Sequence, residues 1–264
     1  MPELPDVEVF KRYFDATALH QSIQEVEVYP EQILGGVTGR ELKLRLSGQT
    51  FSATRRHGKY LFASLDGNEC WLVFHFGMTG YLKYFKKPTK KPLFDRMLIT
   101  FENGYRLAYV SKRKLGRIEP AAEPDRFIRH KGLGPDALSP DLDAETFREI
   151  VISRDAMIKS VLTDQSAVAG IGNVYADEIL FQAGIRPKKK ASRLSRELVD
   201  RIFDRMREVL RTAIDCRAEP DRMPDYFLTP RRDADDATCP VCGETIRKTR
   251  IADRPTRNCP TCQS

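Results

Sequence analysis

The residues whose spacing most directly indicates chemistry are four cysteines near the C-terminal end of the sequence. They form two C-x-x-C pairs, Cys239 with Cys242 and Cys259 with Cys262. Each pair can present two thiolates to one ion, and the segment between the pairs is long enough for a hairpin. The spacing therefore predicts one structural Zn²⁺ whose four sulfur ligands leave no position open for a substrate. Disulfides or redox chemistry are the alternatives, and clustering of this kind in a cytosolic chain favours the metal.

The segment between the cysteine pairs is rich in arginine, with Arg247, Arg250, Arg254 and Arg257. Guanidinium groups on a small rigid hairpin are suited to contacts with phosphate. A solvated charged face is the alternative interpretation, and the residues themselves do not decide between the two.

A glycine-rich turn precedes an expected helix over residues 173–183. Gly170 and Gly172 permit a tight turn with positive φ, and Asn173 has the side chain of a typical N-cap. Backbone amides at the start of a helix can bind phosphate. An ordinary turn between two helices would have the same pattern.

The charge balance favours a polyanionic partner. The 264 residues include 44 Lys and Arg against 37 Asp and Glu, which gives a formal net charge of +7. Nucleic acid is the first candidate and an anionic membrane surface the second, whereas a merely basic surface needs no partner. The sequence has no apolar run of membrane-spanning length and no evident secretory signal, so we expect a cytoplasmic protein without a membrane partner.

The elements expected around these motifs indicate an α+β protein with several domains. Residues 1–133 begin with a helix over residues 5–19 and continue as short β-branched and aromatic segments of a β-sandwich or flattened barrel. Leu42, Leu44 and Leu46 alternate with charged residues, which is typical of a strand. Asp66-Gly67 and Asn103-Gly104 are hairpin signals. The basic, proline-containing segment at residues 86–92 is a poor candidate for a strand.

The rest of the chain is expected to be helical and then to end in the cysteine hairpin. Residues 134–232 form the helical domain and residues 233–264 the zinc-ribbon hairpin. The helices are predicted from apolar periodicity at residues 144–152, 156–164, 173–183 and 195–215.

Six segments, read together and in order, resemble one protein family. They are PELPDVE at 2–8, GKYL at 58–61, HFGMTG at 75–80, LGPDAL at 133–138, DQSAVAGIGNVYADEILFQAGI at 164–185, and the terminal cysteine pairs followed by Gln263. Over residues 2–263 the chain resembles the formamidopyrimidine-DNA glycosylase (Fpg) family, which is related to endonuclease VIII. The resemblance implies a β-sandwich domain, a helix-two-turn-helix domain and a zinc hairpin, with damaged double-stranded DNA as the partner.

The resemblance also implies a chemical role for the N-terminal residues. Removal of Met1 would make Pro2 the nucleophile, because its secondary amine can attack the sugar and form an iminium ion. Glu3 would be the general acid–base. The expected activity is that of a bifunctional DNA glycosylase/AP lyase of base excision repair, which ends in β,δ-elimination. Without the resemblance, Pro2 and Glu3 would be read as a frayed terminus.

Further residues match DNA-contacting positions of the family. They are Lys59, Met78, Arg113, Leu115, Asn173 and Arg254. The resemblance implies that Lys59, Asn173 and Arg254 hold the phosphates beside the lesion, and it places Lys59 and Arg254 with the catalytic residues. Met78 would fill the space left by the extruded nucleotide, and Arg113 would address the opposite base.

The sequence departs from the family pattern at several places. Asp6 stands where the family usually has Glu, Ser111 replaces an Asp, and Leu115 replaces a wedge phenylalanine. Phe94-Asp95-Arg96 stands where His-Asp-His is common, and the link before Tyr226 is several residues shorter than in Fpg. The capping loop for oxidised purines comes from that link. The general activity is therefore expected to be intact, whereas a preference for 8-oxoguanine stays open.

Three readings of the function follow. The first is an Fpg-like enzyme for oxidised purines and formamidopyrimidines, which the N-terminal segment favours. The second is an enzyme with the oxidised-pyrimidine or AP-site specificity of endonuclease VIII, for which the short link and Leu115 leave room. The third is a non-catalytic protein that binds damaged DNA, although the retained Pro2, Glu3 and Lys59 count against it. A monomer is expected in each case.

Overall fold

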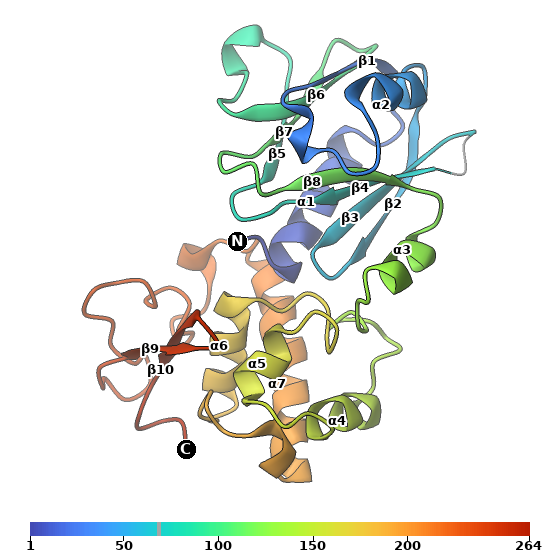
Figure 1. The fold of residues 1–264 in the computed structure, drawn as a ribbon. Helices are drawn as coiled ribbons and strands as arrows, with labels where there is room; N and C mark the ends of the chain where they lie inside the picture. The colour runs from blue at the N-terminus through green and yellow to red at the C-terminus, as the bar shows by residue number, and fades with distance from the viewer. Residues whose placement is uncertain (68–69) are drawn as a thin grey trace. The chain divides into compact units, whose positions relative to one another are not determined.

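Two antiparallel sheets dominate the first of two units in the computed structural model, which describes residues 1–67 and 70–264 (Figure 1). This unit comprises residues 1–2 and 6–131. One sheet has the order β1 (Ile23–Val28), β6 (Asp95–Phe101), β7 (Arg106–Val110) and β5 (Tyr81–Phe85). The other has the order β2 (Phe51–His57), β3 (Tyr60–Leu65), β4 (Trp71–His75) and β8 (Arg117–Ala121). The predicted β-sandwich is confirmed.

Aromatic side chains fill the core of this unit and fix the helix that carries the N-terminal residues. That helix, α1 (Leu4–Thr17), places Phe14 against Phe51 and Phe74, with ring centroids 5.0 and 6.1 Å apart. The three rings are fully buried. Burial of one such side chain contributes about 1.5–3 kcal/mol to the stability of the folded state. These ring contacts therefore hold α1 firmly against the sheets.

The strand predicted around residues 42–46 is wrong, because these residues belong to helix α2 (Gly39–Leu46). Thr38 and Glu41 form a capping box, in which each side chain accepts a hydrogen bond from the backbone amide of the other. Leu42 and Leu46, four residues apart, are buried, whereas Leu44 is 73% exposed. Residues i and i+4 lie on one face in a strand as well as in a helix, so the spacing of Leu42 and Leu46 fits both structures. The capping box at Thr38 and Glu41 favours the helix.

The predicted turns lie where the strands pair. Asn103-Gly104 connects β6 to β7, with Gly104 at φ 78°. Asp66-Gly67 opens the connection from β3 to β4, which pair antiparallel, while residues 68–69 of this connection lie outside the described residues. Residues 86–92 form no strand and include the short 3₁₀ turn η2 (Pro88–Lys90), as expected.

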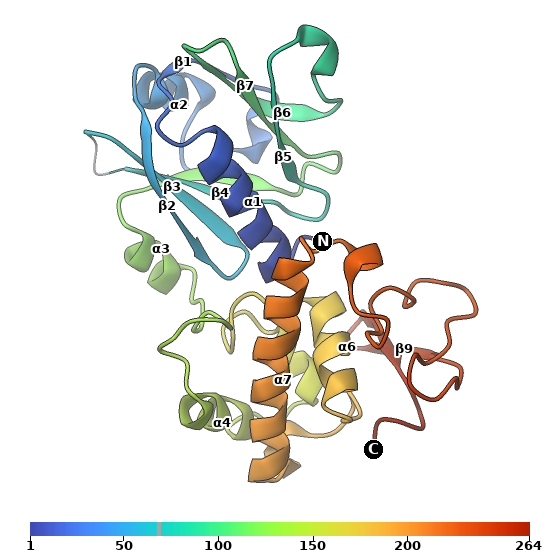
Figure 2. The same cartoon turned by 180° about the vertical axis from the view of Figure 1, so that it is seen from behind.

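The second unit, residues 3–5 and 132–264, is helical and ends in a hairpin. Its elements are α4 (Ala144–Ile152), α5 (Ile158–Thr163), α6 (Asn173–Gln182), α7 (Arg196–Asp215), β9 (Arg247–Ile251) and β10 (Arg254–Asn258). Figure 2 shows the long α7 between α4 and α6. Its apolar stripe, which includes Ile202, Met206 and Leu210, is buried as predicted. No described helix is long and apolar enough to cross a membrane.

The remaining elements are short connections. Helix α3 (Pro124–His130), which the sequence analysis did not predict, ends the first unit. The other 3₁₀ turns are η1 (Glu31–Ile33), η3 (Ala191–Arg193) and η4 (Pro220–Arg222). The link from α7 to Tyr226 is therefore made of one turn and short irregular segments.

Candidate functional site

The Glu3 carboxylate lies at the N-terminal end of α6, where it accepts three backbone hydrogen bonds. The amides of Gly172 and Tyr175 donate to Oε2 at 2.7 and 3.2 Å, and that of Val174 donates to Oε1 at 2.8 Å. The first amides of a helix have no partner inside the helix, and this end of the helix dipole attracts negative charge. Glu3, which is 2% exposed, therefore supplies from far away in the sequence the cap that α6 needs.

The two glycines before α6 leave room for the N-terminal residues. A Cβ on Gly172 would collide with the Glu3 carboxyl carbon and lie 2.7 Å from its Cγ. A Cβ on Gly170 would lie 2.8 Å from the Leu4 Cβ, and the Leu4 amide donates to the Gly170 carbonyl at 2.9 Å. The expected positive φ is found at Gly170 (114°) but is wrong for Gly172, whose φ is −119°. Gly172 is needed for close approach and not for its backbone conformation.

Asn173 is not the helix cap that the sequence suggested. Gly172 occupies the N-cap position and Asn173 is the first helical residue. With Gly172 at the N-cap, the Glu3 carboxylate takes the amides of Val174 and Tyr175 that a capping side chain would bind. The Asn173 Oδ1 is buried and has no hydrogen-bond partner within the described part of the chain. Its contact with a DNA phosphate stays a prediction.

Lys59 lies at the tip of the β2–β3 hairpin, after Gly58 with φ 54°. Its side chain is nevertheless buried, with 6% exposure. Burial lowers the pKa of His75, and the nearby Lys59 ammonium lowers it further. Lys59 is thus buried and is not a solvated surface lysine.

Two neighbouring loops of the first unit bring Met78, Arg113 and Leu115 together. The loop between β4 and β5 approaches the loop between β7 and β8 so closely that a Cβ on Gly77 would collide with the Leu115 carbonyl. The Arg113 amide also donates to the Thr79 hydroxyl at 3.4 Å. Met78 is 40% exposed and Leu115 52% exposed. The two loops therefore present the apolar tips of Met78 and Leu115 together with the exposed cations of the β7–β8 loop, Arg113 among them.

The four predicted cysteine ligands converge in the second unit. Their sulfur atoms all lie within 4.8 Å of one another, with 3.7 Å from Cys239 to Cys262 and 3.5 Å from Cys242 to Cys259. A tetrahedral zinc ion with Zn–S bonds of about 2.3 Å would place its sulfur ligands about 3.8 Å apart. The amides of Val241 and Cys262 donate to the sulfurs of Cys239 and Cys259. The donor set and its spacing fit one structural metal ion.

Arg254 follows the tight turn of the cysteine hairpin. Ala252 and Asp253 form the turn with φ of 45° and 59°, and Arg254 is the first residue of β10. Its side chain is exposed. The guanidinium is therefore presented at the tip of the hairpin, where a phosphate can reach it.

A buried lysine that the sequence analysis missed holds this tip. Lys159 on α5 is 1% exposed, and its ammonium donates to the Pro255 carbonyl at 2.8 Å and to the Thr256 hydroxyl at 2.9 Å. It also forms an ion pair with Asp177 at 2.6 Å. The signal in the sequence was a charged residue inside the apolar run of a predicted helix.

Asp177 extends this network to β10 and to the segment that precedes the cysteines. Its Oδ2 accepts hydrogen bonds from the Arg257 amide at 3.0 Å and from the Arg232 guanidinium at 3.2 Å. Burial raises the pKa of Asp177, and the Lys159 charge opposes this rise. The 2.6 Å approach of the two groups favours the ionised pair. One carboxylate on α6 thus fixes β10 and the segment before the cysteines.

Comparison with known proteins defines the class of this fold and site. Residues 1–118 match the model of the formamidopyrimidine-DNA glycosylase N-terminal domain, and residues 133–223 match that of the formamidopyrimidine-DNA glycosylase helix-two-turn-helix domain. The chain thus joins the two domains that characterise these glycosylases.

Individual relatives agree over the whole length. The formamidopyrimidine-DNA glycosylase of Pelobacter propionicus is 34% identical over 272 residues, covering 100% of both chains. Lactococcus lactis Fpg bound to DNA that contains an AP site superposes with a TM-score of 0.88 at 28% identity, covering 99% of both chains. The same enzyme bound to DNA that contains FAPY-dG gives a TM-score of 0.87 at the same identity and coverage. The chain belongs to the formamidopyrimidine-DNA glycosylase family.

Proposed function

We propose that this protein is a bifunctional DNA glycosylase/AP lyase that removes oxidised purines and formamidopyrimidines from double-stranded DNA. The family membership supports the glycosylase class. The observation that carries the mechanism is the Glu3 carboxylate, the neighbour of Pro2 in the sequence, which three backbone amides at the start of α6 fix in position. The complex of the Lactococcus relative with FAPY-dG DNA supports the substrate class.

Pro2 would supply the nucleophile after removal of Met1, whose side chain is 49% exposed. The lone pair of the proline nitrogen forms a bond to C1′, and the glycosidic bond breaks with its electron pair going to the base, which takes up a proton. Opening of the sugar ring gives an iminium ion, which is positively charged because the amine is secondary. Loss of a C2′ proton then expels the 3′ phosphate, and a second elimination expels the 5′ phosphate.

Glu3 would move the protons in these steps. The three amide hydrogen bonds hold both oxygens of the Glu3 side chain in place. Glu3 would accept a proton and return it to the sugar oxygen. Its fixed position reduces the orientational cost of each transfer.

The remaining predicted residues would bind the DNA. Lys59, Asn173 and Arg254 would hold the phosphates beside the lesion, and Arg113 would address the opposite base. The exposed apolar tips of Met78 and Leu115 are suited to fill the space of an extruded nucleotide. One Zn²⁺ on the four cysteines would stabilise the hairpin that carries Arg254 and take no part in bond breaking.

The decisive experiment is trapping of the iminium ion. Borohydride should link the protein covalently to DNA with an abasic site, and peptide mapping should place the link at residue 2. Pro2→Gly should weaken trapping strongly, while the control Pro5→Ala, a proline whose nitrogen stays in a peptide bond, should trap like the wild type. Absence of trapping by protein that has lost Met1 would refute the lyase proposal and favour a non-catalytic binder.

Substrate preference needs a separate measurement. A panel of duplexes with 8-oxoguanine, formamidopyrimidine, thymine glycol or a plain abasic site should show the fastest cleavage at formamidopyrimidine. Faster release of thymine glycol would instead indicate the specificity of endonuclease VIII. Glu3→Gln should slow base excision about 100-fold or more while DNA binding is retained, because the amide cannot take up the proton.

The proposal extends to the organisation of the protein. We assign residues 1–133 to the catalytic domain, 134–232 to the DNA-binding helical domain and 233–264 to the zinc-finger hairpin. A monomer that works in the cytoplasm on chromosomal DNA is the simplest arrangement for this activity. Sedimentation of the free protein and of its DNA complex would measure the stoichiometry.

A further inference from the structure

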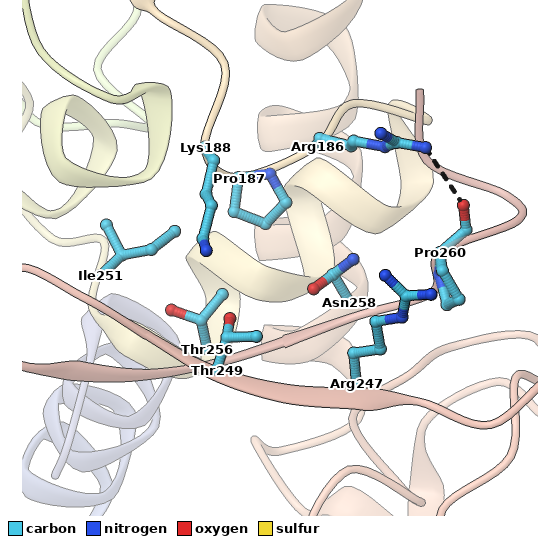
Figure 3. Close-up of a pocket in the computed structure, with 9 residues that line it drawn as sticks. All are labelled: Arg186, Pro187, Lys188, Arg247, Thr249, Ile251, Thr256, Asn258 and Pro260. Carbon is cyan, nitrogen blue, oxygen red and sulfur yellow. Dashed lines mark hydrogen bonds between the residues drawn. The ribbon is translucent and has the colours of Figure 1, made fainter.

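A cavity of about 180 Å³ lies on one face of the β9–β10 hairpin (Figure 3). It is lined by Arg186, Pro187, Lys188, Arg247, Thr249, Ile251, Thr256, Asn258 and Pro260. Three of these residues are basic and none is acidic. The composition of the lining therefore favours a negatively charged occupant.

Strand alternation gathers the hairpin half of this lining. Side chains two residues apart point to the same face of a strand, which groups Arg247 with Thr249 on β9 and Thr256 with Asn258 on β10. The register pairs Arg247 with Asn258 and Thr249 with Thr256. The hairpin thus offers the Arg247 guanidinium, the Thr249 hydroxyl and the Asn258 amide as hydrogen-bond donors in one compact group. The buried Thr256 hydroxyl is already bonded to Lys159 and to the Arg254 carbonyl.

The segment after α6 supplies the other half. Arg186 is held by the chain end, since its Nε donates to the Gln263 carbonyl at 2.9 Å and its Nη2 to the Pro260 carbonyl at 3.5 Å. Figure 3 shows the Lys188 amine turned toward the hairpin strands. Among the described residues, neither Lys188 nor Arg247 forms an ion pair or a side-chain hydrogen bond within this unit. Cations that face one cavity without a counter-charge repel one another, and a bound anion removes that repulsion.

We propose that this cavity is a binding site for one phosphate group. Arginine forks and lysine match the charge and the several acceptor oxygens of phosphate, and the Thr249 and Asn258 donors can add further hydrogen bonds. The volume is below the roughly 300–1,000 Å³ of pockets that take drug-sized ligands, so the site suits a phosphate group and not a whole nucleotide inside it.

Two sources can provide such a group. One is a backbone phosphate of DNA, since Arg254 begins the same strand and has the same parity as Thr256 and Asn258. The other is a small free phosphoanion. The first source rests on the proposed function, whereas the second is independent of it, so the two arms of the test can fail separately.

The first arm uses pyrophosphate and the full-length, zinc-loaded protein. Titration followed by NMR should shift the backbone amides of residues 186–188 and 247–258 saturably. The double variant Lys188→Ala/Arg247→Ala should weaken this binding at least about 10-fold, because two charge-assisted contacts are lost. The control Lys189→Ala/Arg193→Ala removes the same charges from exposed residues outside the lining and should change the affinity less than about 2-fold.

The second arm measures binding of undamaged duplex DNA against salt. If the cavity takes a backbone phosphate, the double variant should reduce the slope of log K against log salt by about 1–2 relative to the control pair. An unchanged slope together with cavity-specific pyrophosphate binding would assign the site to a free phosphoanion. If pyrophosphate causes no saturable shift, or shifts wild type and double variant alike, and the slope is unchanged, the phosphate site is refuted. Wild-type zinc content and melting temperature would show that the variants are folded.

Discussion

Glu3 shows at the scale of one residue how a structural and a chemical role can share the same atoms. Its two carboxylate oxygens accept hydrogen bonds from three backbone amides at the start of α6, so the side chain proposed to move protons is also the cap of a helix. Such a cap is worth about 0.5–2 kcal/mol. Mutation of Glu3 is therefore expected to affect stability as well as catalysis. The stability of each Glu3 variant should be measured together with its rate of base excision.

Gly172 provides a test of this arrangement. Gly172→Ala should destabilise the protein by about 1–3 kcal/mol, because the new Cβ collides with the Glu3 carboxyl carbon although the backbone conformation is an ordinary one. Unfolding in urea, followed by circular dichroism, measures the loss. The double variant Gly172→Ala/Glu3→Ala should be more stable than the sum of the single effects indicates, since the collision partner is gone. Strict additivity would contradict the proposed contact.

At the scale of elements, helix α6 organises the second unit. Its first turn binds Glu3, and Asp177 in its middle binds Lys159, Arg232 and the Arg257 amide. The next residue, Glu178, accepts hydrogen bonds from the Thr229 amide and hydroxyl, each at 2.7 Å. Burial raises the pKa of Glu178, and these hydrogen bonds oppose the rise. One helix thereby fixes the N-terminal residues, the cysteine hairpin and the segment between α7 and that hairpin.

The buried pair should be far more sensitive to mutation than an exposed one. Lys159→Met should lower the free energy of unfolding by about 3–5 kcal/mol. It leaves the buried Asp177 charge with Arg232 alone, which compensates it only partly. The control Lys190→Met breaks the exposed pair with Asp155 and should lower the free energy of unfolding by about 1 kcal/mol or less. Urea denaturation of both variants gives the two values. Similar small losses in both variants would show that the Lys159 network adds little.

At the scale of the whole molecule, the two units have separate hydrophobic cores. The first is built on two sheets and aromatic rings, and the second on helices and a hairpin that four cysteines close. The single tryptophan of the chain, Trp71, lies on β4 in the first unit. Its fluorescence therefore reports on one unit alone.

Loss of zinc should accordingly affect only the second unit. Cys242→Ser should lose the bound ion and the fold of the hairpin, since a structural zinc site supplies folding energy directly. The zinc content and the affinity for damaged DNA should both fall. The urea unfolding transition reported by Trp71 fluorescence should stay as in the wild type. Cys70→Ser, a change at a cysteine outside the cluster, should keep the metal. Retention of zinc in Cys242→Ser would contradict the four-sulfur site.

The sequence by itself determined what depends on near neighbours along the chain. The two cysteines of each pair lie together because each pair spans one short knuckle, and the segment between the pairs is long enough for the hairpin that joins them. Helices α4 to α7 follow from periodicity and punctuation within each segment. The tertiary structure decided the rest. It made Glu3 the cap of α6 in place of Asn173, buried Lys159 against the hairpin, and made a helix of residues 39–46. Hydrogen bonds and burial between segments far apart in the chain set the first two. A charged residue inside an apolar run marked Lys159 locally, but no local pattern identified its partners. The third needed both a local cap and a core that receives Leu42 and Leu46 but not Leu44.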